Sequence, residues 1–365
     1  MQLATTKSPL FQARADRHRS SRGFRMKTVL VTGGAGFIGS HTCKALAAAG
    51  WRPIAFDNLS RGHAEFVRWG PLVEGDILDA AALDIAFVQY RPVAVIHFAA
   101  LAYVGESATR PLAYYNVNVA GLINVVDAML RHGTRTIVFS SSCATYGIPD
   151  RLPIVESAPQ HPINPYGRSK LAGERILADA RAAEGLHVAM LRYFNAAGAD
   201  PDGDLPERHD PETHLIPLAI DAATRGAPAL QIFGSDYPTA DGTCERDFIH
   251  VCDLAAAHVQ ALHYLNAGNA ALTINLGTGR AASVRSVVAA VERITGRMVP
   301  VTHAARRPGD PPVLVADASL ARELIGFAPR LSDLDTVVTT AWRARITQNP
   351  VTKAGVAPAC CAGSS

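Results

Sequence analysis

A glycine-rich loop between an apolar strand and a helix constrains the fold of this chain more than any other feature. The run KTVLVT at 27–32 leads directly into GGAGFIG, which places Gly33, Gly36 and Gly39 in the spacing G-x-x-G-x-x-G. Glycines at this spacing allow a tight turn, a close approach of the backbone to a pyrophosphate, and close packing of helix on strand. The helix that follows offers free N–H groups to the phosphates. The loop therefore predicts a dinucleotide-binding β-α-β unit.

Short apolar runs alternate with helical patterns beyond this loop. Such alternation is typical of parallel β-α-β units in an open sheet, where ligands bind beyond the carboxyl ends of the strands. The sequence therefore predicts an α/β fold with a Rossmann-like doubly wound parallel sheet. The predicted strands are 27–32, 52–57, 94–99, 136–141 and 187–194, and the predicted helices lie near 41–49, 83–90 and 118–130.

The composition of the sequence changes after Asn195, where loops rich in Pro, Asp and Gly replace the alternation of strands and helices. We therefore expect a dinucleotide-binding domain at 27–194 and a smaller, mixed C-terminal substrate domain at 195–345. The stretch 245–278 reads as helix then strand, and its return to the first domain is left open. The tail 346–365 has no periodicity and a low-complexity composition, which predicts disorder.

Composition narrows the class of function. The chain has 365 residues, is 48% hydrophobic and carries a formal net charge of only +3, which indicates a globular protein without a nucleic-acid footprint. The cysteines show neither a C-x-x-C pair nor zinc-finger spacing with histidine, so we expect reduced cytosolic thiols and no metal site. The six cysteines are Cys43, Cys143, Cys244, Cys252, Cys360 and Cys361.

No apolar run approaches the length of a membrane span, and the N-terminus lacks the apolar stretch of a secretory signal. We therefore expect no membrane partner and a cytoplasmic location. Residues 1–26 form a basic extension with six Lys or Arg against the single acid Asp16. Three interpretations stay open for it: a disordered arm, an organelle transit peptide, or an upstream start with Met26 as the true beginning.

The second predicted strand ends at Asp57, at the distance from the glycines where an acid binds the ribose hydroxyls of an adenosine. A carboxylate there repels a 2′-phosphate, so NAD is favoured over NADP. Arg61, four residues further on, argues against this preference for NAD, since an arginine nearby can accept the 2′-phosphate of NADP. Asp76 and Ile77 follow a third strand and are placed to contact adenine, although a polar residue closing a strand explains Asp76 equally well.

Tyr166 and Lys170 lie at i and i+4, on one face of a predicted helix. A tyrosine with a pKa of about 10 is a poor base at neutral pH, since only about one in a thousand is ionised. A nearby lysine and a positive nicotinamide ring stabilise the phenolate, and a shift of about three units corresponds to roughly 4 kcal/mol. Ser142 closes the strand TIVFSS at the predicted cofactor crevice. We therefore predict Ser142, Tyr166 and Lys170 as a proton-transfer set.

From Lys27 to Trp342 the chain resembles the UDP-glucose 4-epimerases, which are extended short-chain dehydrogenases/reductases. The resemblance covers nearly the whole body of the chain. Its motifs are long and occur in order, which makes them specific. These motifs are TGGAGFIGSHT, DNLSRGH, EGDI, HFAALAYVGES, SSSCATYG, NPYGRSK, LRYFNAAGA, DGTCERDFIHVCDLA, NLGTG and RRPGD.

The resemblance implies an NAD-dependent isomerase and a homodimer. It makes Ser142, Tyr166 and Lys170 the catalytic trio, and it carries the cofactor and UDP-sugar contacts onto two further sets of residues. The cofactor set, with Tyr166 and Lys170, is Gly33, Gly36, Phe37, Ile38, Gly39, Asp57, Asn58, Asp76, Ile77, Phe98, Ala99, Ala100, Asn118 and Phe194. The substrate set, with Ser142, is Asn195, Leu215, Ile232, Phe233, Arg246, Arg307, Asp310 and Leu314.

The implied reaction inverts carbon 4 of a UDP-sugar through a transient 4-keto sugar, most simply between UDP-glucose and UDP-galactose. The variant AYVGES also resembles the plant UDP-arabinose 4-epimerases, so hexose and pentose substrates stay open. Leu314 matches a position that limits the group at carbon 2, and its bulk does not decide on N-acetyl sugars. Two rivals remain: a sugar-nucleotide 4,6-dehydratase, which lacks its acid because Cys143 and Ala144 follow Ser142, and a non-catalytic NAD-binding sensor.

Overall fold

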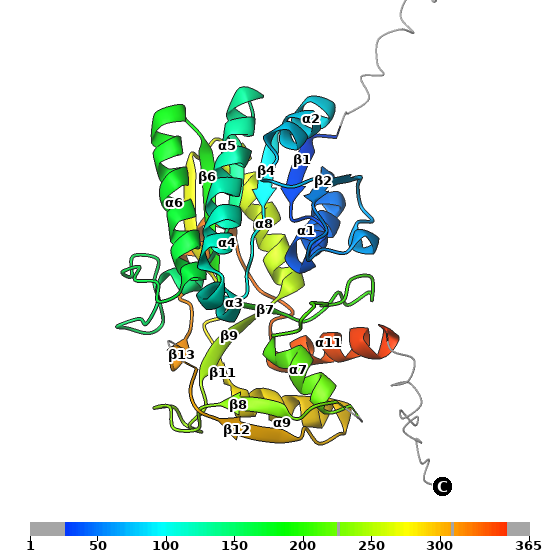
Figure 1. Ribbon diagram of the computed structural model, residues 1–365, viewed down its shortest axis with the longest axis vertical. Helices are drawn as coiled ribbons and strands as arrows, with labels where there is room; N and C mark the ends of the chain where they lie inside the picture. Colours follow the sequence, from blue (N-terminus) through cyan, green and yellow to red (C-terminus); the bar gives the residue numbers. More distant parts are fainter. Residues whose placement is uncertain (1–25, 225–226, 308–309, 349–365) are drawn as a thin grey trace, which may run out of the picture.

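A seven-stranded sheet, parallel throughout, forms the upper part of the molecule in the computed structural model (Figure 1). The structure describes residues 26–224, 227–307 and 310–348. The strand order is β10-β6-β5-β4-β1-β2-β3. From β1 the chain adds β2 and β3 on one side and then β4 and later strands on the other, so β1 and β4 flank the switch point at which doubly wound sheets bind ligands. The strands are β1 (Thr28–Thr32), β2 (Arg52–Asp57), β3 (Leu72–Glu74), β4 (Ala94–His97), β5 (Thr136–Ser142), β6 (His187–Tyr193) and β10 (Ala271–Leu276).

Helices cover both faces of this sheet because successive strand residues point to opposite sides. In β1, Val29 and Val31 join the core cluster under one layer of helices, whereas Leu30 joins the cluster on the other face. The first layer contains α1 (Phe37–Ala48), α8 (Val251–Asn266) and α10 (Ser319–Ile325). The second contains α2 (Ala80–Tyr90), α5 (Gly121–Arg131) and α6 (Pro165–Glu184), with the short α3 (Val104–Thr109) and α4 (Pro111–Tyr115) packed near α6.

A smaller region lies below the carboxyl edge of the sheet and has its own core (Figure 1). Apolar side chains of three helices, among them Ile220, Val291 and Trp342, make up that core. The helices are α7 (Leu215–Ala222), α9 (Val284–Thr295) and α11 (Leu334–Gln348). The strands are β7 (Asn195–Ala197), β8 (Leu230–Phe233), β9 (Glu245–His250), β11 (Ala281–Ser283), β12 (Val301–Ala304) and β13 (Val313–Leu314). Strand β9 pairs with β7, β11 and β13, and β8 pairs with β12.

Several element boundaries differ from those expected from the sequence. Helix α1 begins at Phe37 rather than near His41, because Gly36 occupies the N-cap position and the loop turns directly into the helix. A short π-helical turn at Asn116–Ala120 precedes α5. Within the stretch 245–278, β10 is a strand of the first sheet and α8 packs against that sheet. Strand β9 belongs to the smaller region.

Helix α11 also corrects the predicted tail. The helix runs to Gln348, so the expected boundary at 345/346 falls inside it, because Ile346 still packs against the core of the smaller region. The rest of the predicted tail, the basic residues before Met26, and Cys360 and Cys361 lie outside the described residues. Within the described part of the chain, no helix combines the length and apolarity needed to span a bilayer.

Candidate active site

The glycine loop lies at the switch point of the sheet, between the carboxyl ends of β1 and β4. Gly33 has a φ of +72°, and a Cβ at this position would lie 2.6 Å from the backbone nitrogen of Ala99. A Cβ on Gly39 would lie 2.1 Å from the Gly33 carbonyl oxygen. The loop is therefore packed against the segment Phe98, Ala99 and Ala100 that follows β4, and only glycine fits at these two positions.

The start of helix α1 has the free donors that a pyrophosphate requires. Gly36 is the N-cap residue and provides no side-chain cap, and the first turn contains no acidic residue. A Cβ on Gly36 would meet only the Gly33 oxygen, at 3.3 Å, so the approach to the helix end is open. The N–H groups of Phe37 and Ile38 point to the same end of the helix. These observations fit a dinucleotide, whose pyrophosphate binds such a helix N-terminus.

Asp57 ends β2 with its carboxylate partly satisfied by the backbone. Oδ2 accepts a hydrogen bond from the N–H of Ala35 at 3.0 Å, and Oδ1 accepts one from Leu59 at 2.9 Å. Burial raises the pKa of this carboxyl. Each oxygen keeps acceptor capacity beyond its backbone donor, which suits the two hydroxyls of a ribose.

The remaining predicted cofactor residues lie along the same edge. Asn58 donates to Asp76 Oδ2 at 2.9 Å, which joins the ends of β2 and β3. Ile77, which follows Asp76, lies against Gly121 at the start of α5. Asn118 is buried, and its amide is fully engaged: Oδ1 accepts from Leu101 N–H at 2.8 Å, while Nδ2 donates to Leu101 O and to Ser169 Oγ. Asn118 therefore fixes the loop after β4 onto α6.

The predicted proton-transfer residues come together where β5 ends and α6 begins. Ser142 closes β5 as the N-cap of a short 3₁₀ turn, with Oγ accepting from Ala144 N–H at 3.1 Å. Tyr166 and Lys170 lie in the first turns of α6, and Lys170 Nζ is 5.9 Å from the centre of the Tyr166 ring. The same ammonium donates to the Ser140 carbonyl at 2.8 Å. The sheet thus brings the serine within reach of the helical pair.

In the chain without cofactor, the pKa of the tyrosine is not lowered. The expected stabilisation of the phenolate requires the lysine and a nicotinamide ring together. Burial raises the pKa of Tyr166 to about 12, and the Ser142 hydroxyl acts in the opposite direction. Burial also lowers the pKa of Lys170 to about 7. Burial therefore disfavours the charged forms of both groups in the protein without cofactor. A positive charge from outside the chain, such as a nicotinamide ring, is needed to favour the phenolate.

A buried ionic network below this set was not anticipated from the sequence. Glu174, on α6, accepts two hydrogen bonds from the guanidinium of Arg192 on β6, at 2.8 and 2.6 Å. Ser141 Oγ donates to the same carboxylate at 2.5 Å, as does Gln160 Nε2 at 3.0 Å. The network links α6 to β5 and β6 and so fixes Tyr166 relative to Ser142. Its members are far apart in sequence and belong to no local motif, so only the tertiary structure connects them.

Several of the predicted UDP-binding residues lie on or next to β9. Register pairs Asn195 of β7 with Phe248, and Leu314 of β13 with Arg246. The guanidinium of Arg246 forms an ion pair with Asp310, and that of Arg307 lies 4.0 Å from the centre of the Phe233 ring.

This region meets the end of β5 through a shared apolar cluster. Phe194 and Leu314 pack with Cys143, the neighbour of Ser142. Two predicted contacts have side chains turned elsewhere: Ile232 is buried in β8, and Leu215, which opens α7, packs against the core of the smaller region. A contact from either of these would have to use the backbone or a side-chain edge.

This strand order with this placement of glycines, serine, tyrosine and lysine is that of the short-chain dehydrogenases and reductases. Similarity to known proteins identifies the family within this class. Residues 29–277 match the NAD dependent epimerase/dehydratase family. The chain therefore belongs to the NAD-dependent epimerase/dehydratase family.

Its relatives are epimerases. A UDP-glucose 4-epimerase of Rhizobium leguminosarum bv. trifolii is 51% identical, with 87% of this chain and 96% of the relative covered. The crystal structure of UDP-glucose 4-epimerase from Brucella ovis in complex with NAD is 57% identical and has a TM-score of 0.85, covering 87% of this chain and 98% of that one. A UDP-glucose 4-epimerase from Stenotrophomonas maltophila with bound NAD and formylated UDP-arabinopyranose is 40% identical, also with a TM-score of 0.85, covering 89% and 99%.

Proposed function

We propose that this chain is an NAD-dependent isomerase that inverts carbon 4 of a UDP-sugar, with UDP-glucose and UDP-galactose as the pair. One observation carries the proposal: the Ser142, Tyr166 and Lys170 set lies at the sheet edge between an open glycine loop and the arginine-bearing strand β9. A sugar nucleotide whose sugar reaches Ser142 and whose diphosphate reaches Arg246 spans this arrangement. The names of its relatives agree with this activity.

Tyr166 is the proposed acid and base. As a phenolate it removes the proton from the sugar 4-hydroxyl, and as a phenol it returns that proton after inversion. The Ser142 hydroxyl holds the reacting oxygen, and Lys170, as an ammonium, stabilises the phenolate. NAD, when bound, supplies the acceptor and donor of the hydride at carbon 4.

The UDP group is proposed to stay anchored while the 4-keto sugar presents its other face. Arg246 and Arg307 are suited to this role because the planar guanidinium fork matches phosphate oxygens. Arg246 already pairs with Asp310, and the charges of Arg246, Asp310 and Arg307 all act on the pKa of the Cys244 thiol. Asp310 then exchanges its ion pair with Arg246 for contacts with the nucleotide.

Two finer points belong to the proposal. The Stenotrophomonas maltophila relative holds a UDP-arabinopyranose derivative, which favours a UDP-xylose/UDP-arabinose pair as the second candidate. A homodimer remains our proposal from family resemblance, and the cytoplasmic location stays a prediction.

The dehydratase interpretation finds no support in the structure of this site. A 4,6-dehydratase needs a carboxyl acid after the strand-end hydroxyl, and here Cys143 occupies that place. Its thiol is buried, and burial raises its pKa to about 12, so it is a poor proton donor. The sensor interpretation requires no proton-transfer set, whereas all three of its members are present.

The test is incubation of the purified chain with UDP-glucose, UDP-galactose, UDP-xylose, UDP-arabinose and the N-acetylhexosamine forms, following carbon 4 by proton NMR without added NAD. We expect interconversion of one pair. Tyr166→Phe should reduce the rate by roughly 10²–10⁴-fold, while Tyr264→Phe, on the remote helix α8, should leave it unchanged. Tight NAD binding with no conversion of any sugar would favour the sensor, and full activity of Tyr166→Phe would refute the proposed role of the tyrosine.

A further inference from the structure

Two Glu-x-His pairs form a cluster between β7 and α7, outside the proton-transfer set. The pairs are Glu207 with His209 and Glu212 with His214, and one ligand atom of each residue lies within 4.8 Å of those of the other three. Two imidazoles and two carboxylates form a ligand set typical of divalent transition cations. The cysteine spacing predicted no metal site, and this cluster contains no cysteine.

The carboxylate of Glu207 is the buried centre of the cluster. Its side chain is only 3% exposed, and Oε1 lies 2.7 Å from His214 Nδ1 and 3.7 Å from His209 Nδ1. Among the described residues, the buried atoms Glu207 Oε2 and His209 Nδ1 have no hydrogen-bond partner. A buried carboxylate oxygen without a partner is unfavourable, so a ligand that engages it is favoured.

Neighbouring groups hold the ligand side chains in place. Oε1 of Glu212 accepts hydrogen bonds from the backbone N–H groups of Thr213, at 2.8 Å, and His214, at 2.9 Å. The two imidazole rings meet edge to face with their centres 4.5 Å apart. The His209 ring also packs edge to face on Phe37 of the glycine loop, at 5.7 Å. Such supporting contacts around the ligands are typical of metal sites.

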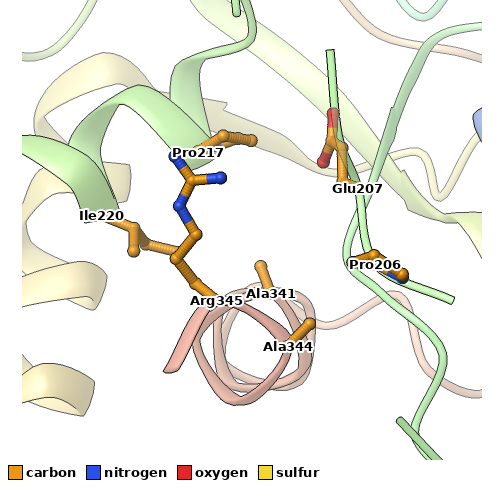
Figure 2. Close-up of a pocket in the computed structure, with 7 residues that line it drawn as sticks. All are labelled: Pro206, Glu207, Pro217, Ile220, Ala341, Ala344 and Arg345. Atoms are coloured by element: carbon orange, nitrogen blue, oxygen red, sulfur yellow. The ribbon is translucent and has the colours of Figure 1, made fainter. Parts of the chain in front are cut away.

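The wall of a pocket shows how Glu207 is enclosed. Figure 2 shows Glu207 and Pro206 on one side of this pocket, with residues of α7 and α11 on the other. Arg345, the cation on the opposite wall, is paired with Asp221 by a bidentate contact and does not neutralise Glu207. Nδ1 of His214 is hydrogen-bonded to Glu207 Oε1 at 2.7 Å, so a divalent cation that binds here replaces the proton shared by this pair.

The other acidic group in the same segment differs in this respect. Asp200, Asp202 and Asp204 surround the ammonium of Lys44, whose Nζ lies 2.8–2.9 Å from an oxygen of each. That group already holds its cation. It therefore serves as an internal control for the cluster at 207–214.

We propose that Glu207, His209, Glu212 and His214 bind a divalent transition cation of the zinc class. The site fastens the segment 199–214 over the cofactor-binding edge, which the segment already contacts at several points. His63 Nε2 lies 3.3 Å from Arg208 O, the Arg208 guanidinium lies 4.8 Å from the centre of the Phe66 ring, and Arg61 donates to Asp210 O. The cation has no part in the proposed hydride and proton transfers.

The test uses untagged full-length protein, treated with a chelator and titrated with Co²⁺ as a spectroscopic probe. We expect stoichiometric binding with the d–d absorption of nitrogen and oxygen ligands, and a rise in Tm on addition of Co²⁺ or Zn²⁺. Absence of both effects in the wild-type chain overturns the proposal. A thiolate-to-cobalt charge-transfer band would assign the ion to cysteines, Cys360 and Cys361 among them, and would overturn it equally.

Variants place the ion. Glu207→Gln keeps the shape and one acceptor, and we expect it and His209→Gln to weaken Co²⁺ binding by at least roughly 10–100-fold. Asp202→Asn, in the acidic group around Lys44, should bind Co²⁺ as the wild type does. Unchanged affinity in both cluster variants, or loss of binding in Asp202→Asn, contradicts the assignment.

Discussion

The ion pair of Glu174 and Arg192 offers a quantitative test of how α6 is held. Both side chains are buried, at 5% and 7% exposure, and two of the four donors on the carboxylate belong to Arg192. Arg192→Met removes those two and leaves a buried charge with only Ser141 and Gln160 as donors. Breaking a buried pair in this way costs about 3–5 kcal/mol. We therefore expect the free energy of unfolding to fall by that amount.

The assay is urea denaturation, compared with a surface pair in the same chain. Arg131 and Asp84 are 46% and 39% exposed and form a similar contact, so Arg131→Met should cost far less, because solvent screens exposed ion pairs. Joint replacement of Glu174 by Leu and Arg192 by Met should cost less than the sum of the two single changes, because no unpaired charge remains. A cost for Arg192→Met equal to that of Arg131→Met would refute the reasoning.

Three further predictions concern the cofactor edge and the UDP-sugar site. Gly33→Ala should lose NAD, measured as nicotinamide retained after gel filtration, because of its φ of +72° and its contact with Ala99, whereas Gly50→Ala, with φ +81° and no neighbour within 4 Å, should keep it. In NAD-free protein, stability should rise with pH from about 7, where buried Lys170 loses its proton, up to about 10, where the unfolded lysine does. Lys170→Met should remove a slope of roughly 1.4 kcal/mol per pH unit in urea denaturation across that window. Arg246→Lys should raise KM for the UDP-sugar more than it lowers kcat, because an ammonium cannot reproduce the bidentate fork.

The fold, which the structure confirms, and the proton-transfer set, which stays a prediction, both rest on local signals in the sequence. A glycine loop between strand and helix, and a Tyr-x-x-x-Lys pair one helical turn apart, depend on neighbours along the chain. The parallel sheet confirms the predicted α/β architecture. The ends of the elements were harder to predict. The start of α1 at Phe37 was missed because its N-cap residue, Gly36, has no side chain that would mark the position.

Other features have no local signal. The contacts of Glu174 join residues from α6, β5 and β6, and no spacing in the sequence announces them. The pair of Glu-x-His motifs is visible in the sequence, yet its significance depends on the two halves folding to within 4.8 Å of each other. The pKa values of Tyr166 and Lys170 follow from burial, which exposes the need for a positive charge from the cofactor.

The sequence by itself determined which carboxylate ends β2, and it indicated which residues are candidates to bind a pyrophosphate and to exchange a proton. Each depends on residue type and on periodicity along a single element. Only the tertiary structure decided which charges are buried, which arginine pairs with which acid, and how the segment 199–214 lies over the cofactor edge. The physical reason is that desolvation and ion pairing depend on distances between segments, and these distances exist only once the sheet and both helix layers are packed.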